Sequence, residues 1–411
     1  MRGAVSSLLR SLAFAGLAVA LGALGPSIRA QTTAMSTSTP TVVEIAASLH
    51  VLARLSDGTV IGLGENRSGQ LARPPLINRW LRPERIPLPA RAVQIAAGED
   101  VSLARLEDGT VWAWGRGVDG MLGVNLAGAT ARHTPAPVPG LSGVVSLAAA
   151  TTSAMAVLED GTVRAWGDLP KVLTGGQKVN PAVFAPIPVR GLRNVATVVT
   201  TAGVGFALTK DGRVFGWGVN TLGQVGLGRT SDEPVPPTEL PGLRDIVSIA
   251  RTGGGAAAVA RDGRVWVWGD NQQGGLGNGV TADTNEPGQP TPQPLEGVTD
   301  AVQVKAGTYG RHFIVLRRNG ALVGWGNSDW GQLGAGISGF PQPTPMVIKL
   351  PPVDDYWLGG NFSFARTKDG ELWFWGEQSA ARRLVGATGN QKVPARILLD
   401  RLLPPAAPIT P

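Results

Sequence analysis

The stretch Asp108-Gly-Thr-Val-Trp-Ala-Trp-Gly115 decides how this chain of 411 residues folds, because it returns twice almost unchanged. Its copies are Asp262-Gly-Arg-Val-Trp-Val-Trp-Gly269 and Asp369-Gly-Glu-Leu-Trp-Phe-Trp-Gly376. In each copy an Asp-Gly pair, which favours a tight turn, precedes a run of β-branched and aromatic residues, which favours a strand. The stretch is therefore predicted to contain the turn and second strand of a β-hairpin, with both central turn residues at positive φ.

The turn signal is periodic along the chain. An Asp-Gly or Asn-Gly pair stands at residues 57, 108, 160, 211, 262, 319 and 369, so the repeat is about 51 residues long. Six residues after each Asp or Asn comes a tryptophan, or Leu63 in the first repeat, and a glycine follows every one. An apolar segment such as Val93-Gln-Ile-Ala96 lies upstream of each hairpin, and the proline-rich region downstream has room for a fourth strand. Each repeat is therefore predicted to hold four antiparallel strands, A to D.

Seven four-stranded units with a periodic aromatic residue predict an all-β fold, a seven-bladed β-propeller. Closing the units into a ring removes the exposed sheet edges of an open array. An open β-solenoid is the alternative architecture. Glycine, at 57 residues, and proline, at 32, disfavour helices. No amphipathic helix is expected between residues 31 and 411.

The ends of the chain differ from the repeats. Arg2 and Arg10 precede an apolar run from Leu12 to Leu24, and Ala30 offers a small residue for cleavage, which predicts a signal peptide over residues 1–30. Residues 31–40 are expected to form a Ser/Thr-rich linker, residues 41–403 the propeller, and residues 404–411 a Pro-rich tail. The protein is therefore expected to be exported, periplasmic or extracellular, with no stable membrane span after cleavage.

Composition excludes several chemistries. The chain has no cysteine, which rules out disulfides, thiolate metal sites and cysteine nucleophiles, and its histidines number only 3. Residues 1–30 hold three of the 37 basic residues and no acid, so 37 minus 3 leaves 34 basic against 30 acidic residues in the remainder. This balance does not favour nucleic-acid binding. No catalytic, cofactor-binding or metal-binding residues are predicted.

A second motif follows the tryptophan of strand C. Gly-x-Asn-x-x-Gly-Gln-Leu-Gly is nearly complete in Gly64-Glu-Asn-Arg-Ser-Gly-Gln-Leu71 and in Gly218-Val-Asn-Thr-Leu-Gly-Gln-Val-Gly226. It returns as Gly326-Asn-Ser-Asp-Trp-Gly-Gln-Leu-Gly334. Together with Asp-Gly-x-Val-x-x-Trp-Gly, this motif makes residues 41–403 resemble the regulator-of-chromosome-condensation repeat family, which implies a seven-bladed propeller. The family usually has histidine seven residues before each Asp-Gly pair, whereas here only His50 and His312 occupy that position.

The tryptophans of strand C are predicted to pack between blades, where a large flat ring fills the space at each repeat. A chromophore array is the alternative reading, since a plant ultraviolet photoreceptor is similar to this family. The nine residues concerned are Trp112, Trp114, Trp166, Trp217, Trp266, Trp268, Trp325, Trp373 and Trp375.

Candidate partner-binding residues are those that depart from the repeat on one face of the ring. Because strands alternate in direction, the A–B and C–D loops emerge on one face and the Asp-Gly turns on the other. Exposed Trp, Tyr and Arg are enriched at interface hot spots. Trp80 and Trp330 are expected in C–D loops and the others in A–B loops; the candidates are Trp80, Glu99, Asp100, Arg251, Tyr309, Arg311 and Trp330.

These features predict a non-enzymatic, monomeric binding scaffold whose A–B/C–D loop face takes a protein or peptide partner. Some secreted bacterial β-lactamase inhibitors are similar to this family, so an inhibitor is one subtype. An envelope carbohydrate-binding or hydrolytic propeller is an alternative. A nucleotide-exchange regulator, as in the founding member of the family, is another.

Overall fold

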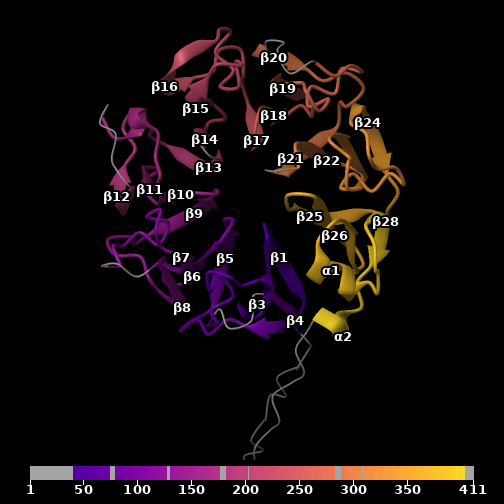
Figure 1. Cartoon of the computed structure of the whole chain (residues 1–411). Helices are drawn as coiled ribbons and strands as arrows, with labels where there is room; N and C mark the ends of the chain where they lie inside the picture. The colour runs from indigo at the N-terminus through magenta and orange to yellow at the C-terminus, as the bar shows by residue number, and fades with distance from the viewer. Residues whose placement is uncertain are drawn as a thin grey trace, which may run out of the picture. The chain divides into compact units, whose positions relative to one another are not determined.

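The computed structural model describes residues 40–74, 79–126, 130–175, 182–201, 203–282, 288–307 and 310–402. These residues form seven four-stranded sheets arranged in a ring (Figure 1). The predicted all-β, seven-bladed propeller is confirmed, and the alternative of an open solenoid is wrong. The predicted signal peptide, the linker up to residue 39 and the tail over residues 404–411 lie outside the described residues.

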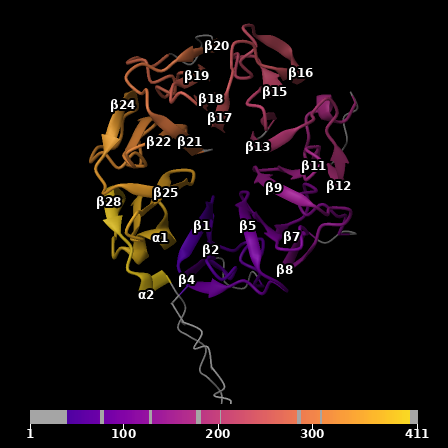
Figure 2. The same cartoon turned by 180° about the vertical axis from the view of Figure 1, so that it is seen from behind.

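Each blade consists of four consecutive antiparallel strands, which run as A to D from the centre of the ring to its rim (Figures 1 and 2). Strands A are β1 (Val42–Ala47), β5 (Ala92–Ala97), β9 (Val144–Ala149), β13 (Val195–Thr201), β17 (Ile246–Arg251), β21 (Ala301–Gly307) and β25 (Val353–Leu358). Strands B are β2 (His50–Leu55), β6 (Val101–Leu106), β10 (Ser153–Leu158), β14 (Val204–Thr209), β18 (Gly255–Ala260), β22 (His312–Arg317) and β26 (Phe362–Thr367). Strands C are β3 (Val60–Glu65), β7 (Val111–Arg116), β11 (Val163–Gly167), β15 (Val214–Asn220), β19 (Val265–Gly269), β23 (Leu322–Gly326) and β27 (Leu372–Gly376). Strands D are β4 (Arg79–Arg85), β8 (Ala131–Pro137), β12 (Val183–Pro188), β16 (Ser231–Glu239), β20 (Gln289–Pro294), β24 (Gln342–Ile348) and β28 (Gln391–Arg396).

The hairpin turn between strands B and C differs from the one expected. Gly109 has a φ of 76°, but among the described turn residues the aspartates are not at positive φ. The Gly109 N–H donates to the Leu106 carbonyl oxygen (3.0 Å), and the Thr110 N–H donates to Asp108 Oδ1 (2.9 Å). This geometry is a type I turn closed by a glycine bulge, because the carboxylate accepts the N–H two residues on and keeps its own backbone at negative φ.

The Gly-x-Asn-x-x-Gly-Gln motif shapes the C–D loop. Asn220 Oδ1 accepts from the Val225 N–H (3.0 Å), and its Nδ2 donates to the Arg229 carbonyl oxygen (2.8 Å), so one amide side chain ties both halves of the loop. Gly223 has a φ of 73°, and a Cβ there would lie 2.5 Å from Cβ of Pro290 in the next blade. The motif therefore encodes a loop that lies directly against the neighbouring blade.

Tryptophan side chains on strand C form the cores between blades. Six of the predicted nine are fully buried, each in an apolar cluster formed mainly with the preceding blade. Indole N–H groups also bond to the preceding C–D loop: Trp114 Nε1 donates to the Gln70 carbonyl oxygen (2.9 Å) and Trp375 Nε1 to that of Gln332 (2.8 Å). The predicted packing is thus confirmed for these six; Trp112, Trp266 and Trp373 are only partly buried against the clusters.

The ring closes by side-chain packing between blades 7 and 1, without strand exchange. Leu63, which replaces tryptophan in the first repeat, shares a core cluster with Phe362 and Phe374 of blade 7. The expectation of no amphipathic helix is wrong here, because the C–D loop of blade 7 contains α1 (Ser379–Leu384), which buries Ala380, Ala381 and Leu384 in the same cluster. Two shorter helices are η1 (Lys171–Leu173) and α2 (Leu399–Leu402).

We expect Trp114→Ala to lower the free energy of unfolding by about 3–5 kcal/mol, because a buried ring and its bond to blade 1 are lost together. Trp112→Ala is the matched control on the same strand and should cost less than half as much, since that ring is only partly buried. Urea denaturation measures both. Equal losses would show that the interface core does not depend on the inner tryptophan.

Candidate partner-binding face

The A–B and C–D loops lie on one face of the ring, as the strand order requires. Within blade 6, Gln332 Nε2 of the C–D loop donates to the Gly310 carbonyl oxygen of the A–B loop (3.4 Å). Between blades 1 and 2, Gln70 Nε2 donates to Asp100 Oδ1 (3.1 Å). We call this surface the loop face; these bonds join its loops both within a blade and between neighbouring blades.

The charged candidates on the loop face contact neighbouring loops. Glu99 and Asp100 lie in the A–B loop of blade 2, as predicted, and Asp100 is 3.9 Å from Arg116 Nη1. Arg311 lies in the A–B loop of blade 6, and its Nη1 is 3.4 Å from Asp270 Oδ2 and 3.2 Å from Gln272 Oε1 of blade 5. The Arg311 bonds link blades 5 and 6 at the surface, whereas the Asp100–Arg116 contact lies within blade 2.

Two candidates are not where the sequence predicted them. Trp80 belongs to β4, not to a loop, and its backbone pairs with Gly64. Arg251 is the last residue of strand β17 and is only 4% exposed, because its guanidinium turns inward to bond three backbone carbonyls. Tyr309 lies outside the described residues. Arg251 therefore cannot be an exposed hot spot of the loop face.

Trp330 is exposed in the C–D loop of blade 6, as predicted, with 46% of its surface accessible. The same loop exposes Ile337 and Phe340, the latter at 73%, and Val393 of the adjacent strand β28 is exposed beside it. The Gly336 N–H donates to the Lys392 carbonyl oxygen (2.9 Å), which holds the loop against β28. We call Trp330, Ile337, Phe340 and Val393 the blade 6 patch.

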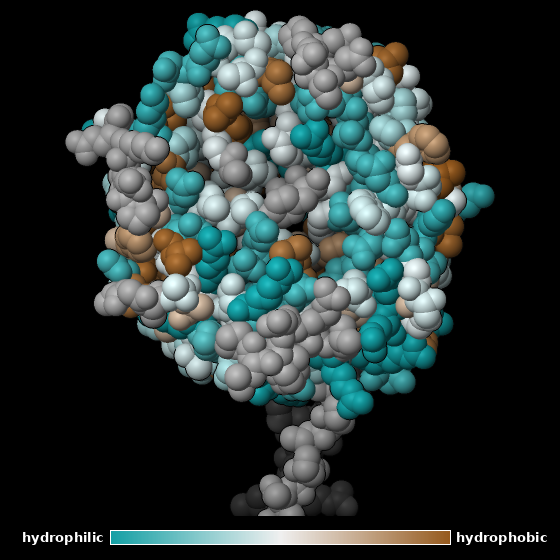
Figure 3. Space-filling model, in the orientation of Figure 1, coloured by the Kyte–Doolittle hydropathy of each residue, from teal (hydrophilic) through white to brown (hydrophobic). Residues whose placement is uncertain are grey.

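The blade 6 patch has a fixed backbone beneath it. The Trp330 N–H donates to Gln332 Oε1 (2.9 Å), and the Ser328 hydroxyl donates to the Ile337 carbonyl oxygen (3.4 Å). The view of one face of the molecule in Figure 3 is mostly hydrophilic, with apolar residues in small separate groups. Sequence reasoning found Trp330 but missed Phe340 and Ile337, although both also stand outside the repeat consensus.

The centre of the ring contains charged side chains on the A strands, of which Arg251 is buried and Glu44 and Lys305 are partly buried. Burial raises the pKa of Glu44, which accepts a bond from Arg54 Nε (2.7 Å). Burial also lowers the pKa of Lys305, whose ammonium bonds Asp355 (2.7 Å). Desolvation is the cause of the pKa of about 9 at Arg251. These groups line or border the central channel and not the loop face.

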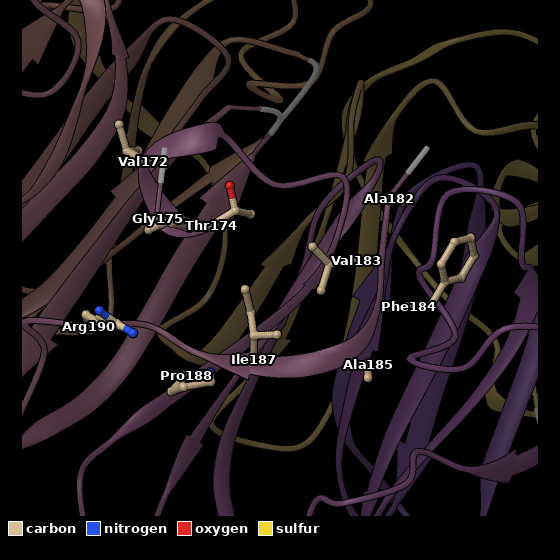
Figure 4. Close-up of a pocket in the computed structure, with 11 residues that line it drawn as sticks. Val172, Thr174, Gly175, Ala182, Val183, Phe184, Ala185, Ile187, Pro188 and Arg190 are labelled. Carbon is tan, nitrogen blue, oxygen red and sulfur yellow. The ribbon is translucent and has the colours of Figure 1, made fainter. Parts of the chain in front are cut away.

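A pocket of about 660 Å³ lies at the rim of blade 3. It is lined by the turn after η1 and by strand β12, including Val183 and Ile187 (Figure 4). Thr174 and Arg190 supply polar side chains among lining residues that are otherwise apolar or glycine. This composition offers no acid–base pair.

The two histidines at the family position are buried hydrogen-bonding residues. His50 Nε2 is 2.7 Å from the Ser102 hydroxyl, which donates to the Gln70 carbonyl oxygen (2.7 Å). Burial lowers the pKa of both His50 and His312 to about 4. In the described part of the chain no group of three or more His, Asp or Glu side chains could hold a metal ion, and no helix there is long and apolar enough to cross a membrane.

The depressed histidine pKa predicts acid sensitivity. Between pH 6.5 and 4 these histidines bind a proton in the unfolded chain but stay neutral in the folded chain. The free energy of unfolding therefore falls as the pH is lowered, by about 2 kcal/mol per histidine between pH 7 and pH 5. Urea unfolding of the wild type at pH 7 and pH 5 measures this loss. His50→Val, which copies Val101 of blade 2, should reduce the pH-dependent loss. The attribution to histidine is wrong if the variant shows the same loss as the wild type.

A sequence profile described as the RCC1-like domain matches residues 15–357. The ultraviolet-B receptor UVR8 of Arabidopsis thaliana is 30% identical over 323 residues, which are 75% of this chain and 70% of UVR8. The E3 ubiquitin-protein ligase HERC2 of Homo sapiens is 27% identical over 351 residues, which are 80% of this chain but only 7% of HERC2. The similarity thus concerns a small part of the ligase.

Solved structures show the same ring. Prp20p of Saccharomyces cerevisiae superposes with a TM-score of 0.70 at 26% identity, covering 83% of this chain and 84% of Prp20p, and its structure is described with its binding properties to Gsp1p and histones. Human WBSCR16 superposes with a TM-score of 0.71 at 22% identity, over 83% of this chain and 94% of WBSCR16, which shows the fold alone.

Proposed function

The chain belongs to the RCC1-like domain family, and from this premise we propose that it is a non-enzymatic scaffold that binds a protein partner through its loop face. Protein binding is described for Prp20p, whose partners are Gsp1p and histones. The observation that carries the proposal for this chain is the exposure of Trp330 within the blade 6 patch. A large aromatic residue exposed on a fixed backbone is the typical anchor of a protein interface.

The proposed partner meets the chain outside the cytoplasm. The charge, apolar run and small-residue order of residues 1–30 support export, and an inhibitor of an exported enzyme is one form that such a scaffold takes. We propose that the chain acts as a monomer. The partner is expected to bury the blade 6 patch and to form polar contacts with the neighbouring loops at its rim.

We expect Trp330→Ala to weaken partner binding by up to about 2 kcal/mol, roughly thirtyfold, without lowering the melting temperature. The measurement uses residues 31–411 as bait in an envelope extract, with quantitative mass spectrometry of the captured proteins, followed by titration of the purified partner.

Val347→Ala is the matched control, since Val347 is exposed on strand β24 of the same blade but away from the C–D loop. It should capture the partner as the wild type does. Unchanged capture by Trp330→Ala would overturn the assignment of the binding face, and a large fall in its melting temperature would make Trp330 a packing residue.

A further inference from the structure

A cavity of about 310 Å³ lies in the central channel, lined by A-strand residues of six blades. Most of the lining is aliphatic and small, for example Ala47, Ala149 and Ala306. Arg251 and Lys305, on neighbouring A strands, are the charged residues in this lining. The wall exposes polar as well as apolar surface, and a lining of mostly aliphatic side chains with a few placed polar groups is the usual form of a small-ligand site.

Arg251 is a buried cation whose hydrogen bonds, among the described residues, all go to carbonyl oxygens. Its Nη1 donates to Val204 of blade 4 (2.8 Å), its Nη2 to Gly253 (3.0 Å) and its Nε to Thr252 (3.0 Å). No carboxylate forms an ion pair with it among the described residues. A guanidinium has five N–H groups, so these three bonds leave two donors and a full positive charge without an anionic partner.

The other charges near the channel are already balanced. Lys305 Nζ bonds Asp355 Oδ1 (2.7 Å), and it lies 4.8 Å from the ring centre of Tyr356. Glu44 Oε2 accepts from Arg54 Nε (2.7 Å). The cavity therefore carries the net positive charge of Arg251, whose own burial limits screening by solvent.

We propose that the central channel binds a small carboxylate with an apolar side chain, with its carboxylate directed to Arg251 and its side chain against the alanines and Leu358. A carboxylate accepts paired N–H groups from a guanidinium, and the bond is strongest in a low-dielectric site. Since most of the lining side chains are aliphatic, with polar side chains such as Thr200 and Lys305 among them, the rest of the ligand is expected to be mainly apolar. The size of the cavity suits an acyl-amino acid or the terminal residues of a peptide. This site is separate from the loop face and does not depend on the partner proposed there.

The test compares N-acetyl-L-leucine with N-acetyl-L-leucinamide, which differ in charge and hardly in shape. Isothermal titration calorimetry on residues 31–411 at pH 7 should show saturable binding of the acid, and binding of the amide weaker by at least about tenfold. Equal affinity for the two, or no saturable binding of the acid, overturns the proposal.

Variants then locate the site. Arg251→Gln should weaken binding of the acid at least about tenfold, and Arg251→Lys, which keeps the charge, should weaken it less. If Arg251→Gln does not fold, Ala47→Phe is the second variant. Its ring should fill the channel from the opposite wall without touching the arginine, and so should abolish binding of the acid. Acid binding that survives Ala47→Phe overturns the proposal. Trp330→Ala is the control and should bind the acid as the wild type does, so a failure of the loop-face function and a failure of the channel site give different results.

Discussion

The apolar core between each pair of blades depends on the side chain six residues after the Asp-Gly turn. In six blades this residue is a tryptophan buried against the preceding blade, and in blades 2, 3, 6 and 7 its indole N–H donates to a loop carbonyl of that blade at 2.8–2.9 Å. A buried indole N–H is costly to leave unpaired, so the loop must present its carbonyl in a fixed place. The Asn and Gln side chains of the C–D loop hold it there, as Asn66 and Gln70 do in blade 1, where the Gln70 carbonyl oxygen accepts from Trp114. The N–H of Trp268 in blade 5 is the exception, since it has no hydrogen-bond partner among the described residues. The Asp-Gly turn, the tryptophan of strand C and the motif of the preceding C–D loop therefore act together in one contact between blades.

Because the consensus residues of the repeat form the interfaces between blades, a binding function is expected from residues that differ from the consensus. A residue that every interface between blades requires is not free to change so as to fit a ligand. The residues that differ from the repeat consensus lie mainly in two places. Trp330 and Phe340 are exposed on a loop whose backbone the consensus Gln332 holds. Arg251 stands in the strand position that is Ala47, Ala97 and Ala149 in blades 1 to 3, and it places a charge in the channel.

The junction between the last and first blades shows how the chain replaces the tryptophan contact. Leu63 is too small to fill the space of an indole and has no N–H to pair, so no loop carbonyl is needed opposite it. Blade 7 accordingly lacks the Gly-Gln-Leu-Gly loop and has α1 in its place, with Ala380, Ala381 and Leu384 packed into the cluster of Leu63. Gln378 caps this helix by accepting from the Ala381 N–H (2.6 Å). The two departures compensate for each other.

The sequence by itself determined the number of blades, the strand order and the buried tryptophans, because these follow from period and hydrophobic alternation, which are local and repeated seven times. It also placed Trp330 and Arg311 on the loop face, since chain direction alone decides that. Tertiary structure decided the rest. Whether Arg251 points to solvent or to the carbonyl of Val204 depends on a residue of the neighbouring blade that is 47 positions away in the sequence. No local sequence pattern predicts that contact. The same holds for α1, which forms against Leu63 of the first blade, and for the turn, where the Asp108 carboxylate selects a type I geometry. Contacts between blades are made by residues far apart in sequence, so only the closed ring shows which side chains remain free to bind.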